Sequence, residues 1–342
     1  RRKSVGEFVR GRFVRIVVPF VVGWFLLRPL LVSGWLMGGA SLRGDYGFWP
    51  NIVAGFKMLE TLPGGIFTGS HLWFLYYLTL LTALVLVVRA LVGAAGAVGE
   101  TATRAADAAA RWVASSALAI PVLAVPTAAA LRFMRYWGMD TPDQSLVPHW
   151  PVLAVYVGFF GLGWLIGRQA KAIEEMSRMS LDRWLFAGGG IAGVLWLGGV
   201  QGDLGHPSYT MAKAGFALSY ATMMWSLVFL TMGAFRKMCA RPRAWIRYVA
   251  DSSYWMYLVH LPVVVWLQVA IAEVALHWSV KLGVVSVAAV GIALVTYDLF
   301  VRSTWVGWVL NGRRRERAMA GWWGRTGAQG RRGEATTSGV GV

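Results

Sequence analysis

The sequence predicts an all-α protein of the polytopic membrane class, a transmembrane helix bundle with about eight visible spans. Hydrophobic residues make up 57% of the 342 residues and charged residues 14%, against roughly 45–50% and about 25% in soluble domains. Nearly all of the net charge of +17 lies on alternate connections between apolar segments. Tryptophan and tyrosine gather at the ends of these segments, which is typical of the membrane interface.

A helix needs about 20 apolar residues to cross the hydrocarbon core of a bilayer. The predicted spans are 16–37, 72–88, 113–131, 150–167, 184–201, 214–235, 248–272 and 279–301. The span at 113–131 contains Pro121 and Pro126, and the span at 184–201 is rich in glycine. Proline is tolerated in membrane helices where neighbours satisfy the freed carbonyl groups, so both segments stay in the prediction.

The basic segments predict the orientation of the chain. They are 1–15, 89–111, 168–183, 236–247 and 302–342, and the connections between them balance to zero. The positive-inside rule therefore places both termini in the cytoplasm. The same charge on a soluble protein would indicate nucleic acid. Because the basic residues here flank apolar spans, we expect the lipid bilayer as a partner and no nucleic acid.

The domain prediction follows from the same pattern. Residues 1–311 form one transmembrane domain, and residues 312–342 form a basic, disordered cytoplasmic tail that becomes rich in Gly, Ser and Thr. The single cysteine, Cys239, excludes an intrachain disulfide framework.

Arg12 and Arg15 lie where the N-terminal arm enters the first span. A spacing of three residues puts both guanidinium groups on one helix face. Two guanidinium groups suit phosphates, whose oxygens accept bidentate hydrogen bonds. The simpler interpretation is that the pair anchors the helix at the membrane surface.

Two histidines are candidates for proton transfer or for binding a hydroxyl group. His71 opens the second span from the outer side, and His260 lies about 18 Å along its helix from the cytoplasmic end, near the middle of the bilayer. An ionisable residue inside a span is a candidate functional site. Tyr257 lies one turn before His260 and shares its polar surroundings. An interfacial role for His71 and a structural hydrogen bond for His260 are the alternatives.

Apart from Lys281 at the start of the last span, three charged residues lie within the spans: Arg28, Asp251 and Asp298. Buried charges are normally paired or face a water-filled cavity. Asp298 or Asp251 is expected to pair with Arg15 or Arg302, in a role that is more often structural than catalytic. The histidines show no metal-ligand spacing, so no metal site is predicted.

Several segments together resemble the acyltransferase 3 family of integral membrane acyltransferases. In order along the chain they are Arg12-x-x-Arg15-Ile16-x-x-Pro19, Gly69-x-His71-Leu72-Trp73-Phe74-Leu75, Arg247-Tyr248-x-Ala250-Asp251-x-Ser253-Tyr254-x-x-Tyr257-Leu258-x-His260-Leu261-Pro262 and Tyr297-Asp298-Leu299-Phe300-Val301-Arg302. The last two are most similar to the branch that succinylates periplasmic glucans. Where the family more often has Glu, this chain has Asp298.

The resemblance implies about ten core helices and an essential Arg-x-x-Arg motif, here Arg12 and Arg15. The family's principal catalytic histidine ends a helix that precedes this motif. Its counterpart is therefore expected upstream of Arg1, so that 1–311 is N-terminally incomplete, or else this protein lacks the usual base. In either case we expect residues 1–342 alone not to turn over acyl-CoA.

The predicted function is a membrane-embedded O-acyltransferase of the bacterial inner membrane. It would move a succinyl or acetyl group from cytoplasmic acyl-CoA, a co-substrate rather than a bound cofactor, to a hydroxyl group of a periplasmic or cell-envelope glycan. Arg12 and Arg15 would hold the CoA phosphates. His71, Trp73 and Tyr257 would line the acceptor side, with His71 and His260 as secondary catalytic candidates. The alternatives are a transporter of a lipid-linked or anionic substrate and a catalytically inactive envelope scaffold.

Overall fold

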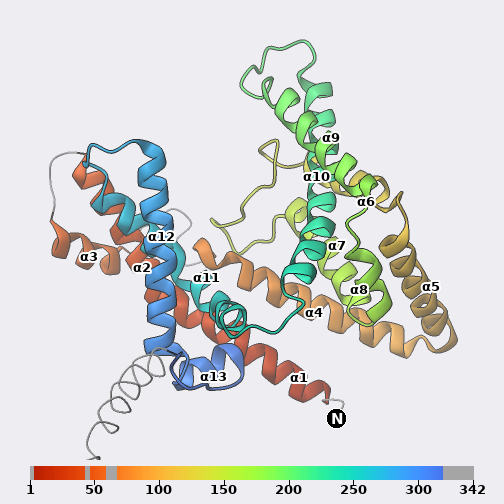
Figure 1. Ribbon diagram of the computed structural model, residues 1–342, viewed down its shortest axis with the longest axis horizontal. Helices are drawn as coiled ribbons and strands as arrows, with labels where there is room; N and C mark the ends of the chain where they lie inside the picture. Colours follow the sequence, from red (N-terminus) through yellow and green to blue (C-terminus); the bar gives the residue numbers. More distant parts are fainter. Residues whose placement is uncertain (1–3, 43–46, 59–67, 319–342) are drawn as a thin grey trace, which may run out of the picture. The chain divides into compact units, whose positions relative to one another are not determined.

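The computed structural model describes residues 4–42, 47–58 and 68–318, whose helices are shown in Figure 1. Every regular element in these residues is helical, so the predicted all-helical class is confirmed. The chain divides into two compact units. Unit 1 consists of Arg1–Leu75 with Ala244–Val342, and unit 2 consists of Tyr76–Arg243.

Unit 1 combines the two ends of the chain. Its helices are α1 (Val5–Arg12), α2 (Val18–Ser41), α3 (Phe48–Lys57), α11 (Ala244–Ala270), α12 (Trp278–Thr296) and α13 (Trp305–Asn311). A π-helical turn at Phe13–Val17 joins α1 to α2, and a second one at Tyr297–Val301 continues α12. The first helix begins at a capping box, in which Ser4 accepts from the Glu7 amide and Glu7 from the Ser4 amide.

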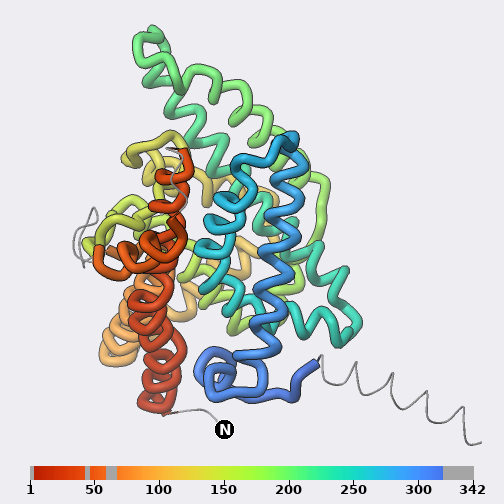
Figure 2. Tube along the Cα trace, turned by 90° about the vertical axis from the view of Figure 1, so that its left-hand side faces the viewer, coloured from red at the N-terminus to blue at the C-terminus, as the bar shows by residue number. Residues whose placement is uncertain are grey.

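In unit 1, α11 packs against both α2 and α12, and α3 packs against α2. Figure 2 shows α11 in cyan beside α12 in blue. Glycine allows the close approaches. A Cβ atom at Gly34 of α2 would lie 2.7 Å from side-chain atoms of Val265 and Trp266. A Cβ atom at Gly55 of α3 would lie 2.6 Å from the Pro29 carbonyl oxygen.

Unit 2 holds the middle of the chain. Its helices are α4 (Trp73–Ala94, from Tyr76 onward), α5 (Gly96–Ser115), α6 (Ala119–Arg132), α7 (Trp150–Ile166), α8 (Ala170–Met176), α9 (Leu181–Gly198) and α10 (Tyr209–Met238). The long helix α10 packs against α9 and α6, and α5 packs against α7 and α8.

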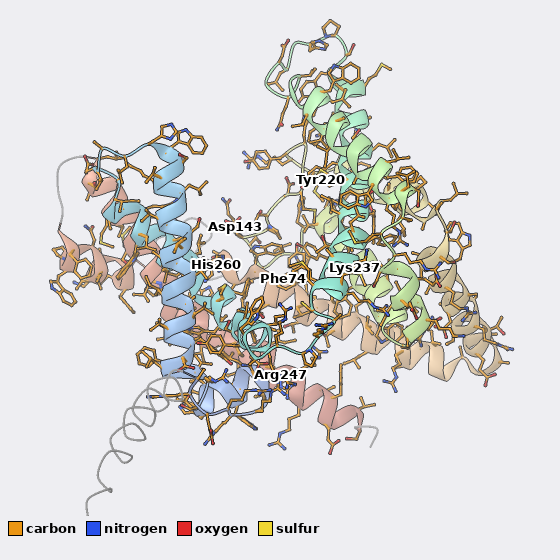
Figure 3. The ribbon with its side chains drawn as sticks, viewed as in Figure 1. Phe74, Asp143, Tyr220, Lys237, Arg247 and His260 are labelled. Carbon is orange, nitrogen blue, oxygen red and sulfur yellow. The ribbon has the colours of Figure 1, made fainter. Side chains whose placement is uncertain are left out.

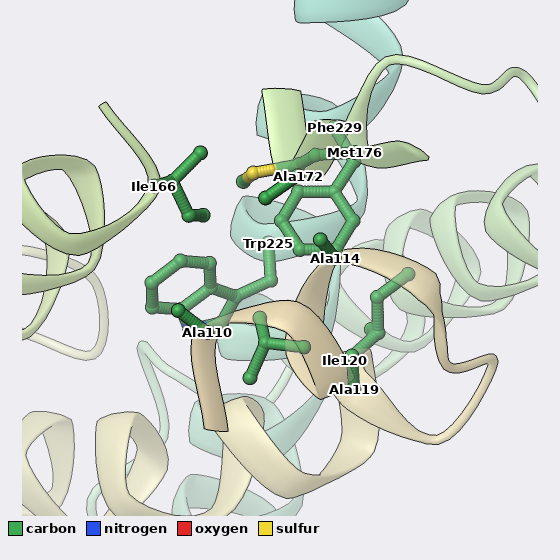
Figure 4. Close-up of a cluster of buried hydrophobic side chains, with 10 residues drawn as sticks. Ala110, Ala114, Ala119, Ile120, Ile166, Ala172, Met176, Trp225 and Phe229 are labelled. Atoms are coloured by element: carbon green, nitrogen blue, oxygen red, sulfur yellow. The ribbon is translucent and has the colours of Figure 1, made fainter. Parts of the chain in front are cut away.

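A compact apolar core joins five helices of unit 2 (Figure 4). Trp225 and Phe229 of α10 lie at its centre, 3% and 0% exposed. The Trp225 ring stacks on Phe159 with 3.9 Å between centroids, and its indole N–H donates to the Thr127 hydroxyl at 3.0 Å. The single polar atom of the tryptophan is therefore satisfied inside an apolar cluster.

Arg183, which the charge pattern placed among the cytoplasmic residues, is 4% exposed in unit 2. Its guanidinium group donates to the carbonyl oxygens of Met176 at 2.7 Å, Ala114 at 3.1 Å and Glu175 at 3.2 Å. These carbonyl groups belong to the C-terminal turns of α8 and α5. Carbonyl groups in the last turn of a helix have no hydrogen-bond donor within that helix. Arg183 thus ties two helix ends together.

The structure supports fewer membrane spans than the eight predicted. A helix covers most of each predicted span, but within the described residues five helical stretches are long and apolar enough to cross a membrane: Val5–Ser41, Ser70–Ala94, Tyr209–Met238, Ala244–Ala270 and Trp278–Val301. The pair α5 and α6 makes a sixth if it counts as one bent span. The helices α7 and α9, over the predicted spans 150–167 and 184–201, do not meet this test.

The predicted span at 113–131 is not one continuous helix. The helix α5 continues into this segment as far as Ser115, and α6 leaves it at an angle of 110°. Pro121 has no N–H group to donate to the carbonyl group of Ala117, so the helix loses a hydrogen bond where the chain bends.

Candidate functional site

The helices α2 and α11 run parallel, and their contacts define a common depth scale in unit 1. The Tyr254 hydroxyl donates to the Arg15 carbonyl, and the Trp266 indole N–H donates to the Leu30 carbonyl at 2.8 Å. Residue numbers therefore rise together on the two helices. This is the arrangement expected of two spans that start on the same side of a membrane.

Three predicted site residues lie close together at one level of these helices. The Nε2 atom of His71 lies 3.0 Å from the Leu258 carbonyl oxygen, and the Tyr257 hydroxyl donates to the His71 carbonyl at 3.0 Å. The rings of His71 and His260 have centroids 6.3 Å apart. Figure 3 labels His260 together with Phe74, whose ring lies 6.2 Å from that of Tyr257. We call His71, Tyr257 and His260 the polar cluster.

The hydrogen bonds fix the tautomers of both histidines. A carbonyl oxygen only accepts, so Nε2 of His71 carries the proton and Nδ1 presents a lone pair. This Nδ1 atom is buried and has no hydrogen-bond partner among the described residues, and the His71 side chain is only 9% exposed. His260 donates from Nδ1 to the Tyr257 carbonyl at 2.6 Å. Each histidine therefore keeps one nitrogen able to take a proton.

The structure places His71 deeper than predicted. His71 was expected at the outer end of its span, but it lies level with Leu258, about 18 Å of helix rise before the end of α11 at Ala270. The Arg15 carbonyl contacts Tyr254, which lies about 9 Å of helix rise before His260.

The segment of residues 68–72, just before α4, places His71 at the level of Leu258. The Trp24 indole N–H donates to the Thr68 carbonyl at 2.8 Å. A Cβ atom at Gly23 would lie 3.0 Å from Leu72, so α2 approaches the segment closely. Ser70 has a φ of 46°, a left-handed conformation that is strained for a side chain other than glycine. This turn aims His71 at α11.

Arg28 is buried next to Trp24, the residue that bonds to this segment. Its side chain is 3% exposed, and its guanidinium carbon lies 4.7 Å from the Trp24 ring. The cation–π contact stabilises a charge that apolar surroundings would otherwise disfavour. Trp73, predicted on the acceptor side, follows His71 at the start of α4 and is half-buried.

Arg12 and Arg15 are both exposed, at the end of α1 and within the first π-helical turn. The Arg12 guanidinium carbon lies 5.2 Å from the Phe8 ring. Residues 312–318 of the predicted tail fall within the described part of the chain, and residues 319–342 lie outside it. Gly312 adjoins the Arg15 guanidinium group so closely that a Cβ atom there would lie 2.0 Å from Nη2.

The two acidic residues of the spans are both paired. Asp298 lies 3.7 Å from Arg302, one of the two expected partners. Asp251 instead pairs with Arg313 and Arg315, each at 2.9 Å, and not with Arg15. Asp251 therefore ties the C-terminal segment to α11, and the Asp298 carboxylate also accepts from the Ala318 amide at 2.9 Å. Both contacts are structural, the role that the sequence favoured.

Sequence reasoning missed Trp24, Ser70, Tyr254 and Gly312. Tyr254 carried a usable signal, since it lies one turn before Tyr257 in the same motif. Gly312 follows an apolar helix and precedes a basic run, which is typical of a helix C-terminal cap. Within the described residues, no three His, Cys, Asp or Glu side chains gather as metal ligands.

Most of the chain is similar to a known protein family. A family model described as an acyltransferase domain matches residues 1–298. The chain belongs to the acyltransferase 3 family. No curated protein and no solved structure gives a significant match. Membership of this family, with the apolar helices, makes the protein a multi-pass membrane acyltransferase.

Proposed function

We propose that the protein is an O-acyltransferase of the bacterial inner membrane that transfers a succinyl or acetyl group from cytoplasmic acyl-CoA to a hydroxyl group of a periplasmic or cell-envelope glycan. The observation that carries the proposal is the polar cluster inside the apolar helices of unit 1, about 9 Å of helix rise from the Arg15 backbone.

On the donor side, Arg12 and Arg15 hold the phosphates of acyl-CoA. Both side chains are exposed and lie three positions apart, just before α2 at its predicted cytoplasmic end. Guanidinium groups bind phosphate oxygens through paired hydrogen bonds, which a single ammonium group cannot reproduce. The extended pantetheine arm then leads the thioester along α11 toward His260.

On the acceptor side, a glycan hydroxyl attacks the thioester carbonyl carbon, the carbon–sulfur bond breaks, and CoA leaves as its thiol. A base takes the hydroxyl proton, which ends on the departing sulfur. Within this chain, the Nδ1 atom of His71 and the Nε2 atom of His260 are secondary proton acceptors. Tyr257 positions His71, and the ring of Trp73 offers an apolar face to a sugar.

The test is acyl transfer by membranes from cells that express the natural gene. The membranes are incubated with radiolabelled succinyl-CoA or acetyl-CoA and periplasmic glycans, and the glycans are analysed for alkali-labile label. Labelled ester that depends on the gene supports the proposal. Transfer of intact glycan across the membrane without ester formation would favour a transporter. Neither activity, with the glycan assembly still dependent on the protein, would favour a scaffold.

A further inference from the structure

The segment after α13 folds back onto α11 near its start. This segment lies outside residues 1–298, which the family model matches. Arg313 and Arg315 each lie 2.9 Å from the Asp251 carboxylate. The Asn311 amide also donates to the Asp251 carbonyl at 2.9 Å. Three successive attachments to one residue hold residues 311–315 in a defined place on unit 1.

Gly312 lies within this segment and directly against Arg15. Its φ of 73° is left-handed, and it ends α13 by donating from its amide to the Trp308 carbonyl at 2.8 Å. A Cβ atom at this position would lie 2.0 Å from Nη2 of Arg15 and 2.6 Å from Cζ. Glycine therefore suits the left-handed backbone, and a Cβ atom at this position would have to displace the end of the Arg15 side chain.

Arg314 lies between the two anchored arginines and differs from both. Its side chain is exposed and makes no hydrogen bond or ion pair within the described residues. It lies two positions after Gly312, so their Cα atoms are at most about 7.6 Å apart. A third exposed arginine is thus carried by backbone close to Gly312, between neighbours whose own charges are engaged with Asp251.

We infer that residues 312–315 complete the donor site: Gly312 positions the guanidinium group of Arg15, and Arg314 adds a further phosphate contact for CoA. The inference rests on the proposed function, because it needs Arg15 to bind the donor. CoA carries a 3′-phosphate and a diphosphate, more anionic groups than Arg12 and Arg15 can each engage in a paired geometry.

The test is equilibrium binding of acetyl-CoA to the purified chain in nanodiscs of neutral lipid. Gly312→Ala should weaken binding at least ten-fold by displacing Arg15, and Arg314→Gln should weaken it about ten-fold by removing a charge-assisted contact. Gly312→Asn keeps a residue that tolerates a left-handed φ but adds a Cβ atom, so it separates displacement of Arg15 from backbone strain. Arg314→Lys should recover part of the loss.

Two controls match these variants. Gly96 also has a positive φ, 51°, but has no atom near the Cβ position, so Gly96→Ala imposes strain without touching Arg15. Arg241 is an exposed cation elsewhere in the chain, so Arg241→Gln removes the same charge from another place. Both should bind acetyl-CoA within about two-fold of the unmodified protein. Thermal unfolding of each variant reports whether it is folded.

The outcomes separate this inference from the proposed function. If Gly312 acts through Arg15, the double variant Gly312→Ala, Arg15→Ala binds no more weakly than Arg15→Ala alone. If Arg15→Ala weakens binding but both the Gly312 and the Arg314 variants bind normally, the inference is wrong and the donor site stands. If Arg15→Ala itself binds normally, the donor site is wrong and the inference falls with it. Equal losses in the controls would also overturn it.

Discussion

At the scale of single residues, unit 1 is organised by side chains that hydrogen-bond to backbone carbonyl groups. Trp24, Tyr254, Tyr257 and His71 each make such a bond. Apolar helices offer few polar side chains as partners, whereas each backbone carbonyl has a second lone pair beyond its helical hydrogen bond. One polar side chain can therefore fix the position of a neighbouring segment.

The hydroxyl of Tyr257 should matter because it fixes the backbone of His71. We expect Tyr257→Phe to reduce acyl transfer about ten-fold, equivalent to about 1.4 kcal/mol in activation free energy, with little change in acyl-CoA binding. Tyr248→Phe is the matched control, since Tyr248 is on the same helix as Tyr257 and loses a hydroxyl that donates to the Leu294 carbonyl of α12. Equal loss of transfer in both variants would contradict a specific role for Tyr257.

Arg15 should act through the shape of its guanidinium group as well as its charge. We expect Arg15→Ala to weaken acyl-CoA binding by about ten-fold or more, with insertion into the membrane unchanged. Arg15→Lys should rescue only part of this loss, because an ammonium group cannot form a bidentate contact. Full rescue by lysine, measured as KM for acyl-CoA, would make Arg15 an electrostatic anchor.

At the scale of helices, glycine decides which helices approach closely. In unit 2, a Cβ atom at Gly190 of α9 would lie 2.8 Å from the Met223 amide nitrogen and 2.9 Å from the Ser219 carbonyl of α10. The glycine-rich part of the predicted span at 184–201 is thus a packing surface. Small residues let two helices approach closely and gain van der Waals contact.

We expect Gly190→Leu to separate α9 from α10 and to destabilise unit 2 by roughly 1–3 kcal/mol or more through overpacking. Gly188, two residues earlier on α9, has open space at the Cβ position. Gly188→Leu should therefore leave stability nearly unchanged. Thermal unfolding of the two variants in the same detergent compares them directly, and similar melting temperatures would show that the close packing contributes little.

At the scale of the whole molecule, the chain ends meet in unit 1 and the middle forms unit 2. The polar cluster, Arg12, Arg15 and the C-terminal segment all belong to unit 1. The chain passes from unit 1 to unit 2 after Leu75, shortly after His71. It returns to unit 1 at Ala244, where α11 begins. Every candidate residue for the chemistry is therefore carried by the two ends of the sequence.

The single cysteine tests the predicted orientation of the membrane helices. Cys239 is exposed at the end of α10, in a basic segment that the positive-inside rule assigns to the cytoplasm. We expect it to resist a membrane-impermeant thiol reagent in intact cells and to react after permeabilisation. Labelling before permeabilisation, in cells shown to be sealed, would reverse the orientation.

Much of the fold was predictable because hydrophobicity and length act locally along a helix. The segments at 16–37, 214–235 and 248–272 all proved to be helices, with ends shifted by a few residues. The bend before α6 was harder to predict, because a proline in a membrane helix either kinks it or is accommodated, according to its neighbours. The sequence also supplied His71, Tyr257 and His260 as candidates, but as separate features on two spans.

The all-helical class, the membrane character and the motifs of the family followed from the order of residues, since composition and periodicity need no knowledge of distant contacts. The meeting of His71 with His260, the parallel packing of α2 and α11, and the placement of Gly312 against Arg15 depended on tertiary structure. These are contacts between residues separated by nearly two hundred positions or more. Pairing over such separations depends on how whole helices pack, and no local pattern encodes it.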